Sequence, residues 1–252
     1  MTTDFYNKVA KKFGGYAYGR SNPQYTTEYL NGVPEDIFNT KLLGVSGLDK
    51  VVLDTGCGDC KYTFEIAGNF KKIVGIDTSE ELLKIAKQKK PSSGLRNVSI
   101  FLQDAAKTGF KDGSFDIIYS RRGPTYYQEY FRLLKMGGYY FEIAVGEKDC
   151  VEIKEIFQRG QNYEKWNESK LKEKERKVKD IGFKVIFAQD YFYNKYYRSY
   201  NDLDLFLQTV PIFEDFDSEE DKIFLKEYTG KYKEEKGIKL PCHRIIMQLE
   251  KI

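Results

Sequence analysis

The chain has 252 residues, of which 41% are hydrophobic and 31% charged, with 41 basic and 38 acidic residues and a net charge of +3. This length and composition favour a globular fold with a sizeable buried core and exclude a disordered chain. The near-balance of charge gives no electrostatic support for DNA binding, which normally needs a clear basic excess. We found no apolar run near the roughly 20 residues that a membrane span needs, so we expect no membrane partner.

The chain begins with MTTDFYNKVAKKFGG, which lacks the apolar core of a signal peptide. The four cysteines form no pattern typical of a disulfide framework. Together these features predict a cytoplasmic protein. Residues 1–37 precede the first clear strand, and we interpret them as an N-terminal arm.

Short apolar runs then alternate with segments whose apolar residues recur at i, i+3 and i+4. The predicted strands are 50–54, 72–77, 98–103, 115–120, 137–145, 182–190 and 243–252. The predicted helices are 60–70, 79–90 and 124–136, followed by a charged, solvated helical region over 149–180. This alternation predicts an α/β fold, a doubly wound, Rossmann-like sheet of seven mostly parallel strands.

A tyrosine-rich segment separates the last two predicted strands. Residues 191–241 contain helical stretches near 201–209 and 218–230, and we expect them to form an inserted cap. No repeat or low-complexity linker divides the chain. The expectation is therefore one domain over residues 1–252, with the cap inserted at about 191–241.

The stretch VVLDTGCGDC, residues 51–60, allows two interpretations. Cys57 and Cys60 form a C-x-x-C motif, which would suggest redox or metal chemistry. Gly56 and Gly58 instead suggest the turn between a buried strand and a helix, where a ligand can approach a backbone without Cβ atoms.

Acidic residues favour the second interpretation. Asp54, Asp77 and Asp104 stand at the ends of three successive predicted strands, and such ends share one edge of a parallel sheet. Asp77 follows the glycine loop by about 20 residues, where a carboxylate can hold ribose hydroxyls. The third glycine of a dinucleotide motif is replaced by Lys61, so an NAD-dependent oxidoreductase becomes a weaker alternative.

The ordered set of segments over residues 40–145 resembles class I S-adenosylmethionine-dependent methyltransferases. VVLDTGCGDC resembles their glycine-rich motif, VGID the ribose-binding strand end, LQDAA the adenine-contacting segment, and FDIIYSRRGP with RLLKMGGYYFEI the fourth and fifth strands. The resemblance implies a last strand that is antiparallel, S-adenosyl-L-methionine as cofactor and S-adenosyl-L-homocysteine as product. The cofactor-binding residues that it implies are Asp54, Thr55, Gly56, Cys57, Gly58, Asp77, Thr78, Asp104, Ala105, Ser120, Tyr18 and Arg20.

The sequence does not identify the methyl acceptor. A small molecule is favoured over RNA, and a non-catalytic module that binds an adenosyl ligand stays an alternative. Candidate acceptor contacts are Arg121 and Arg122, which could bind a carboxylate or phosphate, together with Tyr196 and Tyr197 of the cap. No general base stands out among Tyr18, Glu142 and His243. We expect no metal site, because Cys150, Cys242 and His243 show no metal-ligand spacing.

Overall fold

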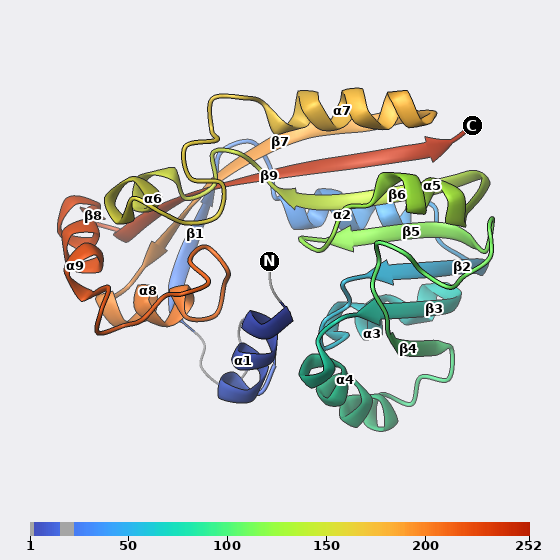
Figure 1. Cartoon of the computed structure of the whole chain (residues 1–252), viewed down its shortest axis with the longest axis horizontal. Helices are drawn as coiled ribbons and strands as arrows, with labels where there is room; N and C mark the ends of the chain where they lie inside the picture. The colour runs from blue at the N-terminus through green and yellow to red at the C-terminus, as the bar shows by residue number, and fades with distance from the viewer. Residues whose placement is uncertain (1–2, 16–22) are drawn as a thin grey trace. The chain divides into compact units, whose positions relative to one another are not determined.

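The computed structural model describes residues 3–15 and 23–252, with the side chains of all of these except 91–93 (Figure 1). The chain divides into two compact units. Unit 1 comprises the described parts of Met1–Gly32, together with Gly146–Ser169 and Tyr191–Arg244, and unit 2 comprises Val33–Val145, Lys170–Asp190 and Ile245–Ile252. The strands β7 (Phe183–Tyr197) and β9 (Gly237–Lys251) contribute residues to both units.

Within the described residues one sheet has nine strands, two more than the seven predicted, because it includes the short strands β1 (Tyr25–Tyr29) and β8 (Lys233–Glu234). In unit 2 its strand order is β7-β9-β6-β5-β2-β3-β4. Its parallel strands are β2 (Gly47–Thr55), β3 (Phe70–Asp77), β4 (Val98–Leu102), β5 (Phe115–Arg121) and β6 (Leu134–Val145). The arrow of β9 points opposite to those of β5 and β6 (Figure 1). The predicted Rossmann-like α/β fold with one antiparallel strand is thus confirmed.

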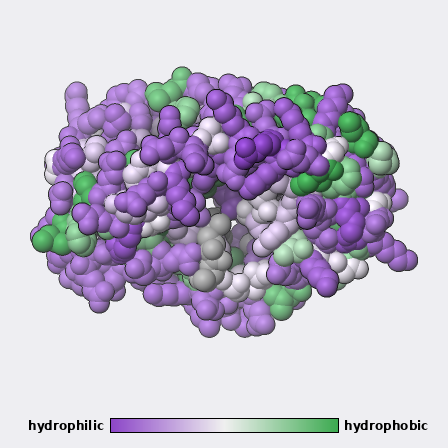
Figure 2. Space-filling view, turned by 45° about the horizontal axis from the view of Figure 1, so that its top comes forward, coloured by the Kyte–Doolittle hydropathy of each residue, from purple (hydrophilic) through white to green (hydrophobic). Residues whose placement is uncertain are grey.

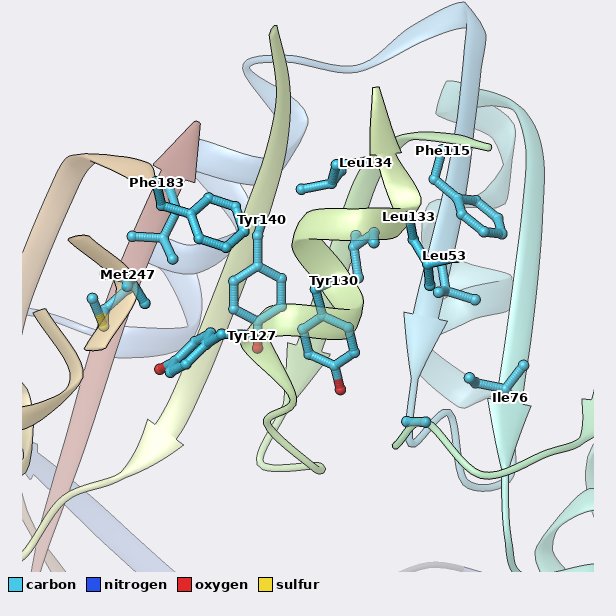
Figure 3. Packing of buried hydrophobic residues seen from close by; sticks show 14 of the residues in the cluster. Leu53, Ile76, Phe115, Tyr127, Tyr130, Leu133, Leu134, Tyr140, Phe183 and Met247 are labelled. Carbon is cyan, nitrogen blue, oxygen red and sulfur yellow. The ribbon is translucent and has the colours of Figure 1, made fainter. Parts of the chain in front are cut away.

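Helices pack on this sheet because each strand carries apolar side chains on both faces. The helical elements of unit 2 are α2 (Pro34–Leu43), α3 (Lys61–Ile66), the short 3₁₀ helix η1 (Ala67–Asn69), α4 (Glu80–Ser93), α5 (Tyr127–Leu133) and α7 (Lys170–Ile181). One buried cluster joins Leu53 of β2, Tyr130 of α5, Tyr140 of β6 and Met247 of β9 (Figure 3). This core holds the strands in register.

The register aligns the carboxyl ends of four neighbouring strands. Thr55 lies opposite Ile76 on one side and Ser120 on the other. Ser120 in turn lies opposite Glu142 of β6. Side chains and loops that follow these positions therefore gather at one edge of the sheet, where ligands bind in open α/β sheets.

Unit 1 has its own apolar core. Its elements are α1 (Thr3–Phe13), β1 (Tyr25–Tyr29), α6 (Val151–Phe157), α8 (Tyr200–Leu207), α9 (Lys222–Lys231), β8 (Lys233–Glu234) and the unit-1 parts of β7 and β9. β1 pairs antiparallel with β7, with Tyr25 opposite Tyr197. Phe157 stacks on Phe213 with ring centroids 4.4 Å apart, and both rings are buried.

Two predicted helices differ from the structure. The helix expected over 124–136 ends at Leu133, because Leu134 is buried as the first residue of β6. The helical region expected over 149–180 is two helices, α6 and α7, and Gly160 between them has a φ of +116° that no helix contains. The expectation of a single domain with an inserted cap stays a prediction.

Polar residues cover most of the surface in view. Figure 2 shows a largely hydrophilic face on which hydrophobic residues form only small, separate spots. Within residues 3–15 and 23–252, none of the helices combines the length and the apolar character needed to cross a membrane.

Candidate functional site

The glycine loop follows β2 and leads into α3. Gly56 and Gly58 have φ values of +74° and +55°, in the left-handed region that glycine adopts without strain. The backbone amides of Gly56 and Cys57 both donate to the carbonyl of Ile76, at 2.9 and 3.0 Å. A Cβ on Gly56 would lie 2.8 Å from Cδ of Pro124, so this close approach requires glycine.

Asp77 connects the end of β3 to the glycine loop. Its Oδ2 accepts a hydrogen bond from the Gly58 amide at 2.8 Å, and its Oδ1 accepts one from the Ser79 amide at 2.8 Å. Burial raises the pKa of Asp77, while these amides act in the opposite direction. A carboxylate can accept about four hydrogen bonds, so a ligand hydroxyl can donate a further one to Asp77.

Asp54 lies buried beneath the same loop. The Thr63 hydroxyl and the Tyr119 hydroxyl, the latter at 2.8 Å, both donate to its Oδ2. Burial raises the pKa of Asp54 to about 6, although these two hydrogen bonds and the nearby Arg121 charge lower it. Asp54 Oδ1 accepts no hydrogen bond from any side chain or backbone group that the structure describes.

The two cysteines of the loop pack against β3. A Cβ on Gly75 would lie 3.0 Å from Sγ of Cys57, so this strand glycine makes room for the thiol. A hydrogen bond with Cys60, together with burial, raises the pKa of the Cys57 thiol. A redox-active C-x-x-C needs a lowered thiol pKa, so the redox interpretation gains no support.

Three further residues of the predicted site lie at or directly after the end of β5. Ser120 is buried, and its hydroxyl donates to the Pro124 carbonyl at 3.1 Å. Arg121 stacks on Tyr62 of α3, with Cζ 3.7 Å from the ring centroid. Arg122 pairs with Glu35 at 3.2 Å. The structure therefore brings Arg121 and Arg122 to the same edge of unit 2 as the glycine loop.

A buried ion pair beside this edge went unrecognised in the sequence. Glu142 of β6 is 1% exposed, and Tyr127 donates to it at 2.8 Å. Lys174 of α7 lies 3.2 Å from the same carboxylate and 3.1 Å from the Tyr127 hydroxyl. Figure 3 shows the rings of Tyr127 and Tyr140 side by side in this region. Both carboxylate oxygens accept hydrogen bonds, so Glu142 holds Tyr127 of α5 and Lys174 of α7 together.

The remaining cofactor candidates lie at the ends of β3 and β4 or outside the described residues. Thr78 is exposed, Asp104 is exposed and accepts from the Ala106 amide at 2.8 Å, and Ala105 is buried. Tyr18 and Arg20 fall outside the residues that the structure describes.

The predicted residues of unit 1 are packed within that unit. The Tyr196 hydroxyl donates to Glu28 at 2.7 Å, and the fully buried Tyr197 contacts Tyr25 and Phe206. Their role in acceptor binding stays a prediction. His243 is buried, its Nδ1 accepts from the Lys148 amide at 3.2 Å, and its ring stacks on Phe192. These contacts are those of a structural histidine.

Cys150 and Cys242, which look scattered in the sequence, are neighbours in unit 1. Their thiols and an oxygen of Asp149 all lie within 4.8 Å of one another. Arg244, however, donates to Asp149 Oδ1 at 2.6 Å. Asp149 Oδ1 thus accepts from a guanidinium, and the cluster contains a buried ion pair beside two thiols.

This edge of unit 2 has the features of a nucleotide-type binding site in an α/β fold, and comparison with known proteins gives its family. The family described as a methyltransferase domain matches residues 48–205. The chain therefore belongs to this methyltransferase-domain family, in agreement with the resemblance seen in the sequence.

Curated relatives match only part of their own length. A demethylmenaquinone methyltransferase of Lactococcus lactis subsp. lactis is 35% identical over 97 residues, which cover 34% of this chain and 38% of that protein. The corresponding protein of Geobacillus stearothermophilus is 35% identical over 89 residues, again 34% and 38% of the two chains. The match thus spans well under half of these relatives.

Solved structures share the fold at low sequence identity. A candidate methyltransferase from Bacillus halodurans C-125 aligns with a TM-score of 0.64 and 18% identity, covering 86% of this chain and 99% of that one. Geranyl diphosphate C-methyltransferase of Streptomyces coelicolor A3(2), solved with S-adenosyl-L-homocysteine, aligns with a TM-score of 0.53 and 16% identity, covering 86% and 78%.

Proposed function

We propose that this protein transfers the methyl group of S-adenosylmethionine to a small-molecule acceptor, with the cofactor bound at the carboxyl edge of the unit 2 sheet. One observation carries the proposal. Asp77 is fixed between the amides of Gly58 and Ser79, next to a glycine loop that leaves the backbone open. A carboxylate held in this way presents its free lone pairs to the hydroxyls of a ribose.

The other residues of this edge fit the same ligand. Gly56 and Gly58 allow the amino-acid part of the cofactor to approach the loop. Asp54, with an unused Oδ1, suits the cofactor's ammonium group, and Asp104 with Ala105 suits the adenine. In this proposal Thr55, Cys57, Thr78 and Ser120 complete the edge, and Tyr18 and Arg20 stay predicted cofactor contacts.

The cofactor supplies an activated methyl group on a sulfonium. In the reaction the acceptor nucleophile forms a bond to the methyl carbon, and the carbon–sulfur bond breaks to release S-adenosylhomocysteine. The contribution of the protein is to hold the two reactants in line, because proximity and orientation account for much of the acceleration. A base is needed only where the nucleophile must lose a proton.

A small-molecule acceptor is supported by two findings. The chain has a net charge of only +3, and RNA-binding surfaces are normally basic. Its curated relatives are named for demethylmenaquinone, a small molecule. RNA methylation would instead be indicated by methyl incorporation into RNA and none into small quinols or related acceptors.

Thermal unfolding with added ligands tests cofactor binding. S-adenosylhomocysteine at about 100 times its dissociation constant should add roughly 2.7 kcal/mol of stability and raise Tm by roughly 5–10 °C. Equal concentrations of NAD should give no shift. A shift with NAD alone would overturn the proposal.

The substitution Asp77→Asn tests whether the Asp77 carboxylate binds the cofactor. It places an amide where the carboxylate accepts hydrogen bonds, so we expect S-adenosylhomocysteine to bind at least about 10-fold more weakly. Asp49→Asn is the matched control, because it removes the same charge from an exposed side chain that pairs with the neighbouring Lys50. Equal affinities of the two variants would contradict the assignment of Asp77.

A further inference from the structure

The end of β5 holds a cation, Arg121, that forms no salt bridge with a residue that the structure describes, although the charge of Asp54 acts on it. Arg121 forms no ion pair and donates no hydrogen bond to any of the residues that the structure describes. Its Nε is buried without a partner. Burial and the adjacent Arg122 lower the pKa of Arg121, yet a guanidinium remains charged at any physiological pH. Withdrawing such a charge from water without pairing it is costly.

The aromatic neighbours of Arg121 do not satisfy this charge. The guanidinium lies over Tyr62 at 3.7 Å and near Phe38 at 6.0 Å. Stacking fixes the plane of the guanidinium but uses none of its five N–H donors. Stacking thus holds the group flat, and none of its donors is used by a residue that the structure describes.

We propose that Arg121, with Arg122 beside it, binds a carboxylate group of a ligand. The charges at this point indicate a single negative charge rather than a phosphate dianion. Arg122 is already paired with Glu35 at 3.2 Å, whereas Arg121 is influenced by Asp54 but forms no ion pair with a described residue, so at most one further negative charge is needed. A planar guanidinium also matches a carboxylate in a two-point arrangement. This inference rests on the proposed function, whose binding edge it shares.

Two ligands of a methyltransferase can supply a carboxylate: the amino-acid part of the cofactor and the methyl acceptor. The position of Arg121 is compatible with either, because it follows Ser120 at the edge and its charge acts on Asp54. The experiment therefore has one arm for each source.

The first arm compares S-adenosylhomocysteine with 5′-methylthioadenosine, which lacks the amino-acid part, by titration calorimetry on the whole chain. If the cofactor carboxylate binds Arg121, then Arg121→Gln lowers the affinity for S-adenosylhomocysteine roughly 10- to 100-fold and leaves the affinity for methylthioadenosine unchanged. The second arm titrates benzoate into protein saturated with S-adenosylhomocysteine, observed by ligand NMR. Loss of benzoate binding in Arg121→Gln identifies the acceptor as the source.

Two further variants keep the result interpretable. Arg121→Lys keeps the positive charge but loses the two parallel N–H donors of the guanidinium. The affinity of this variant for the carboxylate ligand should therefore fall between those of wild type and Arg121→Gln. Arg176→Gln removes the same charge from an exposed position of α7 and should change nothing. Each variant is first checked by Tm for folding.

The proposal is overturned if folded Arg121→Gln binds S-adenosylhomocysteine and benzoate as wild type does. Failure of the proposed function looks different, because wild type would then bind neither S-adenosylhomocysteine nor methylthioadenosine. In that case the benzoate titration, run on the free protein, still decides whether Arg121 holds a carboxylate.

Discussion

Asp54 makes the stability of this protein depend on pH in an unusual direction. Its pKa in the folded state is about 6, above the ordinary value of 3.8. The folded state therefore holds the proton more tightly than the unfolded state, and stability falls as pH rises from about 4 to about 6. For a buried group this loss amounts to roughly 3 kcal/mol.

Urea unfolding from pH 4 to pH 7 measures this effect. Asp54→Asn removes the titrating group, so its free energy of unfolding should fall less across this range than that of wild type. The two curves should become parallel as pH approaches 7, where Asp54 is largely ionised in both states. Parallel curves over the whole range would show that Asp54 titrates normally in the folded state.

Alanine substitutions at Gly56 and Gly113 distinguish the cost of backbone strain from the cost of a steric contact. Both have positive φ, +74° and +61°, but a Cβ on Gly113 would meet nothing within 4 Å, whereas one on Gly56 meets Pro124. Gly113→Ala should cost about 1 kcal/mol and leave cofactor affinity unchanged. Gly56→Ala should lower the free energy of unfolding by more than this and should also weaken the binding of S-adenosylhomocysteine. Urea unfolding measures the first effect and titration calorimetry the second. Equal losses in both variants would mean that the Pro124 contact relaxes freely.

For single residues, the sequence predicts only those positions in the site that follow from the order of strands and helices. Asp54 and Asp77 were predicted at one edge because carboxyl ends of parallel strands share that edge. The stacking of Arg121 on Tyr62 was not predictable, since it depends on the orientation of α3 against β5. The same holds for Cys150 and Cys242, which tertiary packing alone brings together.

Among the elements, α7 is attached to the sheet by the Lys174–Glu142 pair. Removing the lysine leaves a carboxylate that is 1% exposed without its counter-ion, so Lys174→Met should cost roughly 3 kcal/mol. Adding Glu142→Gln to that variant should recover part of the loss, because no charge is then buried. A double-mutant cycle by urea unfolding measures both effects.

Lys177→Met is the control for this cycle. Its pair with Glu173 lies on the same helix but is exposed, so the loss should stay below about 1 kcal/mol. If Lys174→Met costs no more than Lys177→Met, the buried pair does not stabilise the attachment of α7.

The sequence predicted where the apolar strands lie, but β7 and β9 are longer than the predicted 182–190 and 243–252, and β1 was missed. The apolar pattern of β5 predicted 115–120, and the strand spans Phe115–Arg121. β1 has the sequence YTTEY with every residue partly or fully exposed, and its partner β7 is about 170 residues away. No local pattern distinguishes such a strand from a loop.

For the whole molecule, the continuity of β7 and β9 predicts cooperative unfolding. Each strand runs from one unit into the other without a break, so melting one unit removes strand partners from the other. We expect a single transition in differential scanning calorimetry, with equal calorimetric and van't Hoff enthalpies. Two separated transitions would contradict the single-domain prediction.

The place of β9 also determines when the protein can fold during its synthesis. β9 lies between β6 and β7 in the sheet but follows both in the chain. Until the ribosome has released β9, the nascent chain carries two apolar strands that lack the neighbour between them. Unpaired strand edges can form hydrogen bonds with other chains and so cause aggregation, which chaperones prevent. The yield of this protein in a cell thus depends on how long translation delays its last strand.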